Sequence, residues 1–217
     1  MGYTSQSFAV DLQKIRNMFG SGDHGLLEKV KTSNLYEHYA DTVEPGEFEA
    51  LMSDIFIRYI PPEKRKTEKK FFGLITTQQS STLNPDYGYA YGYALLVICD
   101  AFGQHLTPQG DIFYFGSEWK KISQEFSDKG FKVNLDKMWE PGNVFDIPPI
   151  GDFPVINSYS KKEISYLVQN LENFEIDDNL GDIDGDEFDE YHVFLKALRD
   201  GLLTCQKKDV EWVSFIH

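Results

Sequence analysis

The feature that most limits how this chain can fold is a run of acidic residues near its C-terminal end. Residues 172–190 contain ten carboxylates and no basic side chain. Charges this dense lie within about one Debye length of each other, roughly 8 to 10 Å in physiological salt, and repel unless a counter-charge is present. The segment must therefore be solvated, bind cations or face a basic partner, and the sequence alone does not choose among these.

Composition limits the class of protein. The chain has 217 residues, of which 41% are apolar and 15% aromatic, enough to build a hydrophobic core. Its net charge of −14 disfavours binding to nucleic acid or to an anionic membrane, because both are held by basic side chains. The favoured companion is a basic protein or a cation.

Targeting signals and cysteines indicate the compartment. The N-terminal residues show no basic region followed by an apolar run, and no stretch approaches eighteen consecutive apolar residues. Cys99 and Cys205 are far apart in sequence and belong to no CxxC motif. We therefore expect a cytoplasmic protein with two reduced thiols.

Hydrophobic spacing predicts both strands and helices. Alternation predicts strands over residues 3–10 and 210–216, and the second has apolar residues on both faces, which is typical of a central strand. A hairpin-like segment is expected over residues 106–115 around Pro108-Gln109-Gly110. Apolar repeats of three and four predict helices after Asp11, after Asp23, over 47–60, over 89–101, after Ser117, after Ser160 and from the acidic segment to Gly201.

Smaller signals refine these elements. Ser160 with Glu163 forms a capping-box pattern. Tyr89 and Tyr93 fall at core spacing in the helix over 89–101, while Gly88 and Gly92 would let another backbone approach closely. Residues 141–154 contain four prolines and read as an irregular connection, the most plausible internal boundary.

Four segments in this order resemble a known family: VDLQKIRNMFGSGDHGLLEKV, YGYALLVICDAFG, FPVINSYSKKEI and the terminal DVEWVSFIH. They are similar to an uncharacterised bacterial family, catalogued only as a domain of unknown function, and distantly to the YfbM-like group. The resemblance spans nearly the whole chain. It implies an α+β fold in which the first and last strands come together, and it carries no established activity and no catalytic residues.

We therefore expect a single α+β domain over residues 1–217, with a possible sub-boundary at 141–154. Several amphipathic helices would pack on a small sheet that contains the N- and C-terminal strands.

Calcium binding is the first function to consider for the acidic segment, because its DxDGD motif resembles an EF-hand loop. With Gly185 in the sixth position, Asp182 and Asp184 fill the third and fifth. The first position is then Leu180 and the twelfth is Tyr191, so the charged first ligand and the bidentate glutamate are both absent. We expect no specific metal site and no cofactor, although weak cation association stays open.

Enzyme signatures are weak. The sequence has no GxSxG, HExxH, Walker or GxGxxG motif, and its five histidines form no metal-ligand spacing. Ser21 to His24 places nucleophile-like residues side by side, but neighbours at a helix start rarely have the geometry of a triad, so we interpret them as capping. His192 lies near Asp189, which favours a surface ion pair over a catalytic base. No catalytic residue is predicted.

The acidic segment is instead predicted to contact a protein. Carboxylates accelerate association with a basic partner and pair bidentately with arginine, while aromatic residues beside them supply anchors. Phe174, Phe188 and Tyr191 are the anchor candidates, and a core role in the flanking helices is the favoured alternative for each. The predicted contact residues are Asp177, Asp178, Asp182, Asp184, Asp186, Glu187, Phe188, Asp189, Glu190 and Tyr191.

The most concrete form of this hypothesis is an immunity or antitoxin protein that neutralises a basic toxin. Two alternatives stay open. One is an enzyme or metal-dependent protein with a dispersed site, with Tyr87–Tyr93 as a pocket wall. The other is a homodimer joined through the acidic segment and the basic cluster of Lys64, Arg65, Lys66, Lys69 and Lys70, for which a solvated surface is the simpler reading.

Overall fold

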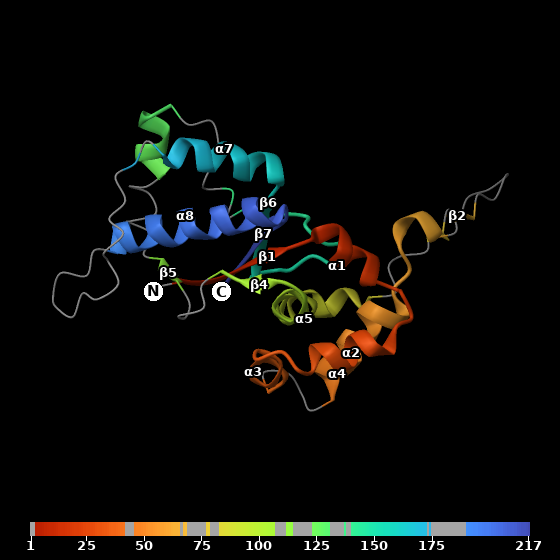
Figure 1. Cartoon of the computed structure of the whole chain (residues 1–217). Helices are drawn as coiled ribbons and strands as arrows, with labels where there is room; N and C mark the ends of the chain where they lie inside the picture. The colour runs from red at the N-terminus through yellow and green to blue at the C-terminus, as the bar shows by residue number, and fades with distance from the viewer. Residues whose placement is uncertain are drawn as a thin grey trace. The chain divides into compact units, whose positions relative to one another are not determined.

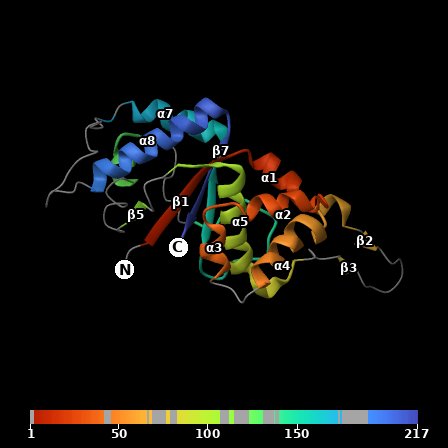
Figure 2. The same cartoon turned by 60° about the horizontal axis from the view of Figure 1, so that its bottom comes forward.

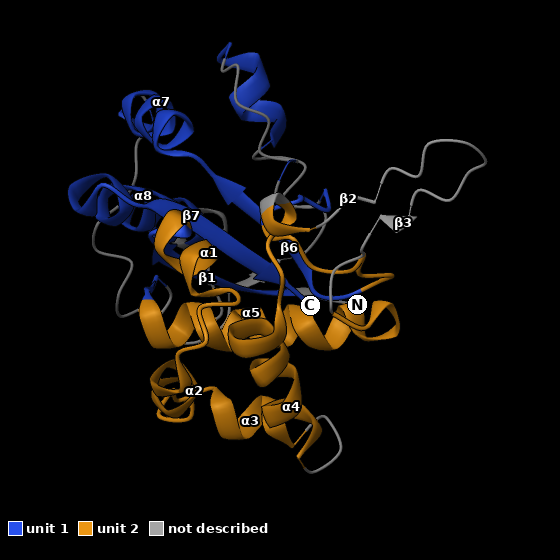
Figure 3. Ribbon diagram, turned by 90° about the vertical axis from the view of Figure 1, so that its right-hand side faces the viewer, with its two compact units in different colours: residues 1–12, 103–144, 153–217 blue, residues 13–102, 145–152 orange. Residues whose placement is uncertain are grey.

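A computed structural model provides the structure of the chain. It describes residues 3–41, 46–65, 67–68, 77–78, 83–106, 112–114, 123–130, 137, 140–172, 174 and 190–217. These residues include helices and an antiparallel sheet (Figure 1), which confirms the predicted α+β class. The chain divides into two compact units, 1–12 with 103–144 and 153–217, and 13–102 with 145–152 (Figure 3).

The first unit contains the sheet. Its strands are β1 (Tyr3–Val10), β4 (Gln104–His105), β5 (Ile112–Tyr114), β6 (Val155–Tyr159) and β7 (Glu211–Ile216). The order is β4-β1-β7-β6, every pair is antiparallel, and β5 also pairs with β1. The first and last strands pair from Ser5 opposite Ile216 to Val10 opposite Glu211, as the family resemblance implies.

Strand β7 is central, as its apolar residues on both faces predicted. Trp212 and Phe215 point to opposite faces because side chains alternate along a strand, and both are buried. Of the predicted hairpin-like segment over 106–115, the structure describes only residues 106 and 112–114, so its turn lies outside the described residues. Strand β5 of this segment pairs with β1 at residues 3–5, and β4, which precedes the segment, pairs with β1 at Phe8 and Ala9.

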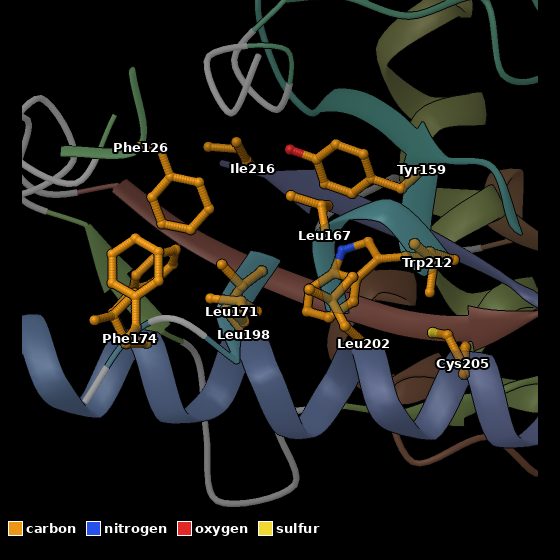
Figure 4. Packing of buried hydrophobic residues seen from close by; sticks show 14 residues of the cluster. Phe126, Tyr159, Leu167, Leu171, Phe174, Leu198, Leu202, Cys205, Trp212 and Ile216 are labelled. Atoms are coloured by element: carbon orange, nitrogen blue, oxygen red, sulfur yellow. The ribbon is translucent and has the colours of Figure 1, made fainter. Parts of the chain in front are cut away.

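Two helices lie side by side on one face of this sheet, α7 (Lys161–Leu171) and α8 (Glu190–Lys208) (Figures 1 and 2). Leu167 and Leu171 of α7 and Leu198 and Leu202 of α8 meet Trp212 of β7 in the core (Figure 4). The predicted capping box is present: Ser160 Oγ accepts from the Glu163 amide, and Glu163 Oε2 accepts from the Ser160 amide at 2.8 Å.

The prediction that Gly201 ends the last helix is wrong. Helix α8 continues to Lys208, and Gly201 is buried in it. A Cβ there would lie 2.8 Å from Cη2 of Trp212 and closer still to Cζ3. Glycine is therefore needed at this position so that the indole can pack against the helix backbone, and it does not mark a terminus.

The second unit is mainly helical. Its central element is α5 (Gly88–Phe102). Its other elements are α1 (Leu12–Met18, whose first residue belongs to the first unit), α2 (His24–Val30), α3 (Tyr36–Ala40), α4 (Glu47–Ser53), the π-helix η1 (Asp54–Arg58), the 3-10 helices η2 (Pro62–Lys64) and η3 (Pro85–Tyr87), and the paired strands β2 (Thr67–Glu68) and β3 (Thr77–Gln78). Helices α2, α3 and α4 pack against α5 (Figure 2).

Several local predictions in this unit are confirmed. Leu12, Ile15, Met18 and Phe19 are buried along one helix face, and the Asp23 side chain caps α2 by accepting from the Gly25 amide at 2.8 Å. Tyr89 is an exception, because it was predicted to lie in the core but its residue is 49% exposed. In its place Tyr91 is fully buried, since α5 is apolar around most of its circumference.

Residues 141–154 have no helix or strand until β6 begins at Val155, as their prolines predicted. Two of the junctions between the compact units, after residues 144 and 152, fall in this connection, and the other two follow residues 12 and 102. That the whole chain folds as one domain stays a prediction.

Candidate functional site

The predicted contact surface lies almost wholly outside the described residues. Helix α7 ends at Leu171 and α8 begins at Glu190. Of the ten predicted contact residues, the structure describes only the helical backbone of Glu190 and Tyr191. The proposed role of these carboxylates and aromatic residues therefore stays a prediction.

The two ends of the acidic segment are well described, and both enter the same core. Leu171, just before the segment, and Phe174, near its start, are buried; after it, Phe194 and Leu195 are buried in α8. The Phe174 ring stacks on Phe126 with centroids 4.7 Å apart (Figure 4). Phe174 is therefore a core residue, which confirms the favoured of its two predicted roles.

The basic cluster is described only at Lys64 and Arg65. Lys64 is exposed, whereas the Arg65 guanidinium forms an ion pair with Asp146 and donates through Nε to the Ile60 carbonyl at 2.9 Å. One of the five cations thus has a carboxylate partner within its own compact unit.

A polar centre that the sequence did not reveal lies where α4 changes into the π-helix η1. An α-helix was predicted to continue to residue 60, but the Tyr59 amide donates to the Asp54 carbonyl at 2.8 Å, five residues back. A π-turn frees neighbouring carbonyls from the α-helical pattern and is often found at functional sites. Here the Gly20 and Gly22 amides donate to the carbonyls of Ile55 and Phe56 at 2.9 and 3.0 Å.

The Gly20-Ser21-Gly22-Asp23 motif therefore does more than cap α2. Gly20 and Gly22 have φ of +63° and +75°, which favour glycine. A Cβ on Gly20 would lie 3.1 Å from the Tyr59 carbonyl carbon and closer still to its oxygen, so no other residue fits. The motif lets the loop after α1 donate its amides to the end of the π-turn.

Two tyrosine–carboxylate pairs flank the π-turn. The Tyr59 hydroxyl donates to Oδ2 of Asp146 at 2.5 Å, and Arg65 donates to the same oxygen. The Tyr91 hydroxyl donates to Oδ2 of Asp54 at 3.1 Å, and the other oxygen of Asp54 pairs with Arg58 at 3.0 Å.

The chemistry of these pairs favours positioning. Burial raises the pKa of Tyr91 to about 12, so its hydroxyl is a hydrogen-bond donor at neutral pH rather than a phenolate. Spacing in the sequence gives no signal for either pair, because Asp146 lies 87 residues from Tyr59 and Tyr91 lies 37 residues from Asp54.

The cysteines are structural. Both thiols are free and buried, as predicted for Cys99. Burial raises the pKa of Cys99 strongly and raises that of Cys205 to about 12, which leaves little reactive thiolate at neutral pH.

Among the residues that the structure describes, no group of three or more His, Cys, Asp or Glu side chains is placed to hold a metal ion. In the same part of the chain, no helix is long and apolar enough to cross a membrane.

A family model matches residues 1–217 of this chain. The chain belongs to the family described as Domain of unknown function (DUF7691). The match covers all four motifs that carried the resemblance and confirms that part of the prediction. Bacterial origin and the distant likeness to the YfbM-like group stay predictions. No curated protein and no solved structure matches this DUF7691 chain.

Proposed function

We propose that this chain is a non-enzymatic, cytoplasmic protein-binding module, most concretely a bacterial immunity protein that neutralises a basic toxin through its acidic segment. The observation that carries the proposal is the charge of residues 172–190. Ten carboxylates without a base supply most of the net charge of −14. A surface of this kind attracts a basic partner over several ångströms and speeds its association.

The described ends of the segment support this proposal. Phe174, near the start of the segment, and Phe194, just after it, belong to one hydrophobic cluster. Fixed ends reduce the conformational freedom that the segment loses when a partner binds, compared with a tail anchored at one end. A basic toxin would then meet a high density of carboxylates with Phe188 and Tyr191 among them as aromatic anchors.

The test is capture of a partner by the purified protein, from the native organism, at low and high salt. We expect a basic protein at low salt that is lost at high salt, because screening weakens exposed charge pairs. The decisive comparison uses the captured protein in purified form. Asp182→Asn, Asp184→Asn and Asp186→Asn combined should weaken its binding at least ten-fold.

A matched control removes the same number of charges elsewhere. Glu37, Asp41 and Glu140 are exposed, and all lie outside the acidic segment. Their combined change to amides should leave binding nearly unaltered. If both triple variants bind as the wild type does, or both weaken equally, the acidic-segment proposal is wrong.

Oligomeric mass in the same salts separates this proposal from the charge-paired homodimer. A mass that falls to that of the monomer as salt rises would support pairing of the basic cluster with residues 172–190. The Arg65–Asp146 ion pair argues against full use of that cluster, because one of its cations already has a partner within the helical unit. An unchanged monomer would exclude the dimer.

A further inference from the structure

The segment Phe145–Asp152 has an unusual place in the chain. It follows and precedes residues of the sheet-containing unit, yet its contacts assign it to the helical unit. It contains no helix or strand. Irregular segments of this kind are often held by a few side-chain contacts, which makes them candidates for local opening. We call residues 145–152 the strap.

The first attachment of the strap is a polar clasp. Asp146 Oδ2 accepts from both the Tyr59 hydroxyl and the Arg65 guanidinium. The Arg65 side chain is 18% exposed and that of Asp146 is 46% exposed. Hydrogen bonds to a charged group are the stronger class, and here both donors act on one oxygen of the strap.

Aromatic packing lies beside the clasp. The Phe145 ring stacks on Phe19 with centroids 6.0 Å apart and an interplanar angle of 10°, and Phe19 meets Tyr59 edge to face at 5.3 Å. All three aromatic residues are buried. Lifting the strap would therefore uncover Phe19 and the hydroxyl end of Tyr59.

The second attachment is steric and lies farther along the strap. A Cβ on Gly88, the first residue of α5, would lie 2.9 Å from the carbonyl carbon of Pro149 and closer still to its oxygen. This close approach confirms the prediction made for Gly88. The contact between Gly88 and Pro149 is one of close packing and not a hydrogen bond, so it positions the strap without holding it strongly.

We propose that the strap opens locally from the helical unit, and that the Asp146 clasp is the contact that limits its opening. The closed strap covers Phe19 and the π-turn end at Tyr59; the open strap exposes them while the helices stay folded. This is a conformational device built into the fold, independent of the acidic segment.

The buried native cysteines allow a direct test. Pro148 is a buried strap residue, so the Pro148→Cys variant carries a thiol that reacts only when the strap lifts. Cys99 is fully buried in the same unit and reports opening of its helices. Alkylation by N-ethylmaleimide, followed site by site with peptide mass spectrometry, compares the two. We expect the strap thiol to react at least ten times faster than Cys99.

Removing the clasp should change one rate only. Adding Asp146→Asn should raise strap alkylation about ten-fold, because the amide loses the charge-assisted bond to Arg65, while the Cys99 rate stays nearly constant. Asp152→Asn is the matched control, since Asp152 is an exposed carboxylate of the same strap, and it should leave both rates unchanged. High salt should act in the same direction as Asp146→Asn.

Three outcomes would overturn the proposal: equal rates for the strap thiol and Cys99, an equal rise at both sites when Asp146 is changed, or no rise at either. If Pro148→Cys fails to fold, Ile147→Cys places the thiol at the partly buried neighbouring position and keeps the test intact.

Discussion

The indole of Trp212 packs against the backbone of α8 at Gly201, so that a Cβ on Gly201 would lie 2.8 Å from Cη2 and closer still to Cζ3. The contact joins the central strand to the longest helix of the same unit. It also explains why a residue with poor helix propensity sits inside α8.

Gly201→Ala should lower the free energy of unfolding by about 1 to 3 kcal/mol. Overpacking against the buried indole costs more than the roughly 1 kcal/mol that alanine gains as a helix former. Urea unfolding measures the change. Gly151→Ala is the control, because a Cβ there meets nothing within 4 Å, and its effect should stay within about 0.5 kcal/mol. A stabilised Gly201→Ala variant would contradict the packing argument.

Gly20→Ala and Gly22→Ala should differ in stability although both positions have positive φ. Gly22 has open space around its Cα, so alanine there costs only the left-handed backbone penalty, about 1 to 2 kcal/mol. Gly20 adds overlap with the Tyr59 carbonyl, and its substitution should cost about 3 kcal/mol or more. Thermal and urea unfolding of the two variants test this order. Equal losses of stability in the two variants would mean that the contact of Gly20 with the Tyr59 carbonyl adds nothing to the cost of the substitution.

Glu163 should make the free energy of unfolding depend on pH in the acidic range. Partial burial raises the pKa of its carboxyl, but hydrogen bonds from Lys137 and Ser160 outweigh burial, so the pKa lies below its ordinary value of 4.5. The folded protein binds this proton more weakly than the unfolded chain does. The stabilisation is therefore fully present above about pH 4.5 and is lost as pH falls through the lower folded pKa.

Glu163→Gln should flatten that dependence below about pH 4.5. At pH 7 it should also lower stability by about 0.2 to 1 kcal/mol, the usual range for a partly exposed ion pair such as Glu163–Lys137. Urea unfolding at several pH values provides the measurement. Identical slopes for variant and wild type would remove Glu163 from the acid response.

The native thiols should be inert in the folded protein. Burial raises the pKa of both Cys99 and Cys205, which leaves little thiolate at pH 8. A colorimetric thiol assay should therefore detect two cysteines in urea and almost none without it. Rapid reaction of either cysteine under native conditions would contradict this prediction.

Features made by residues close together in the sequence were predicted correctly, and features that depend on distant residues were not. The Ser160–Glu163 capping box was predicted correctly because both partners lie within one helical turn. The central place of β7 was predicted because its buried residues on two faces are a property of six consecutive positions. The end of α8 was misplaced because Gly201 was judged by local propensity alone, whereas Trp212 determines its role.

The polar centre at the π-turn could not be predicted, because it depends on residues far apart in the sequence. Its α-helical pattern continues through residues 54–58, and the π geometry depends on amides from Gly20 and Gly22 more than thirty positions away. Likewise, Asp146 meets Tyr59 only after the strap folds back onto the helical unit. No hydrophobic periodicity in the sequence predicts the contacts of the Gly20 and Gly22 amides or the contact of Asp146 with Tyr59.

Several features could be inferred from the amino-acid sequence alone: the α+β class, the pairing of the terminal strands through a family resemblance, most helix starts, and the concentration of charge at residues 172–190. These follow from local propensity, side-chain periodicity and composition. Three other features became visible in the folded structure: which glycines allow a neighbouring group to approach closely, where the helix becomes a π-turn, and which carboxylate accepts a hydrogen bond from each buried tyrosine. Those features depend on contacts between distant segments, whose geometry exists only once the core has packed.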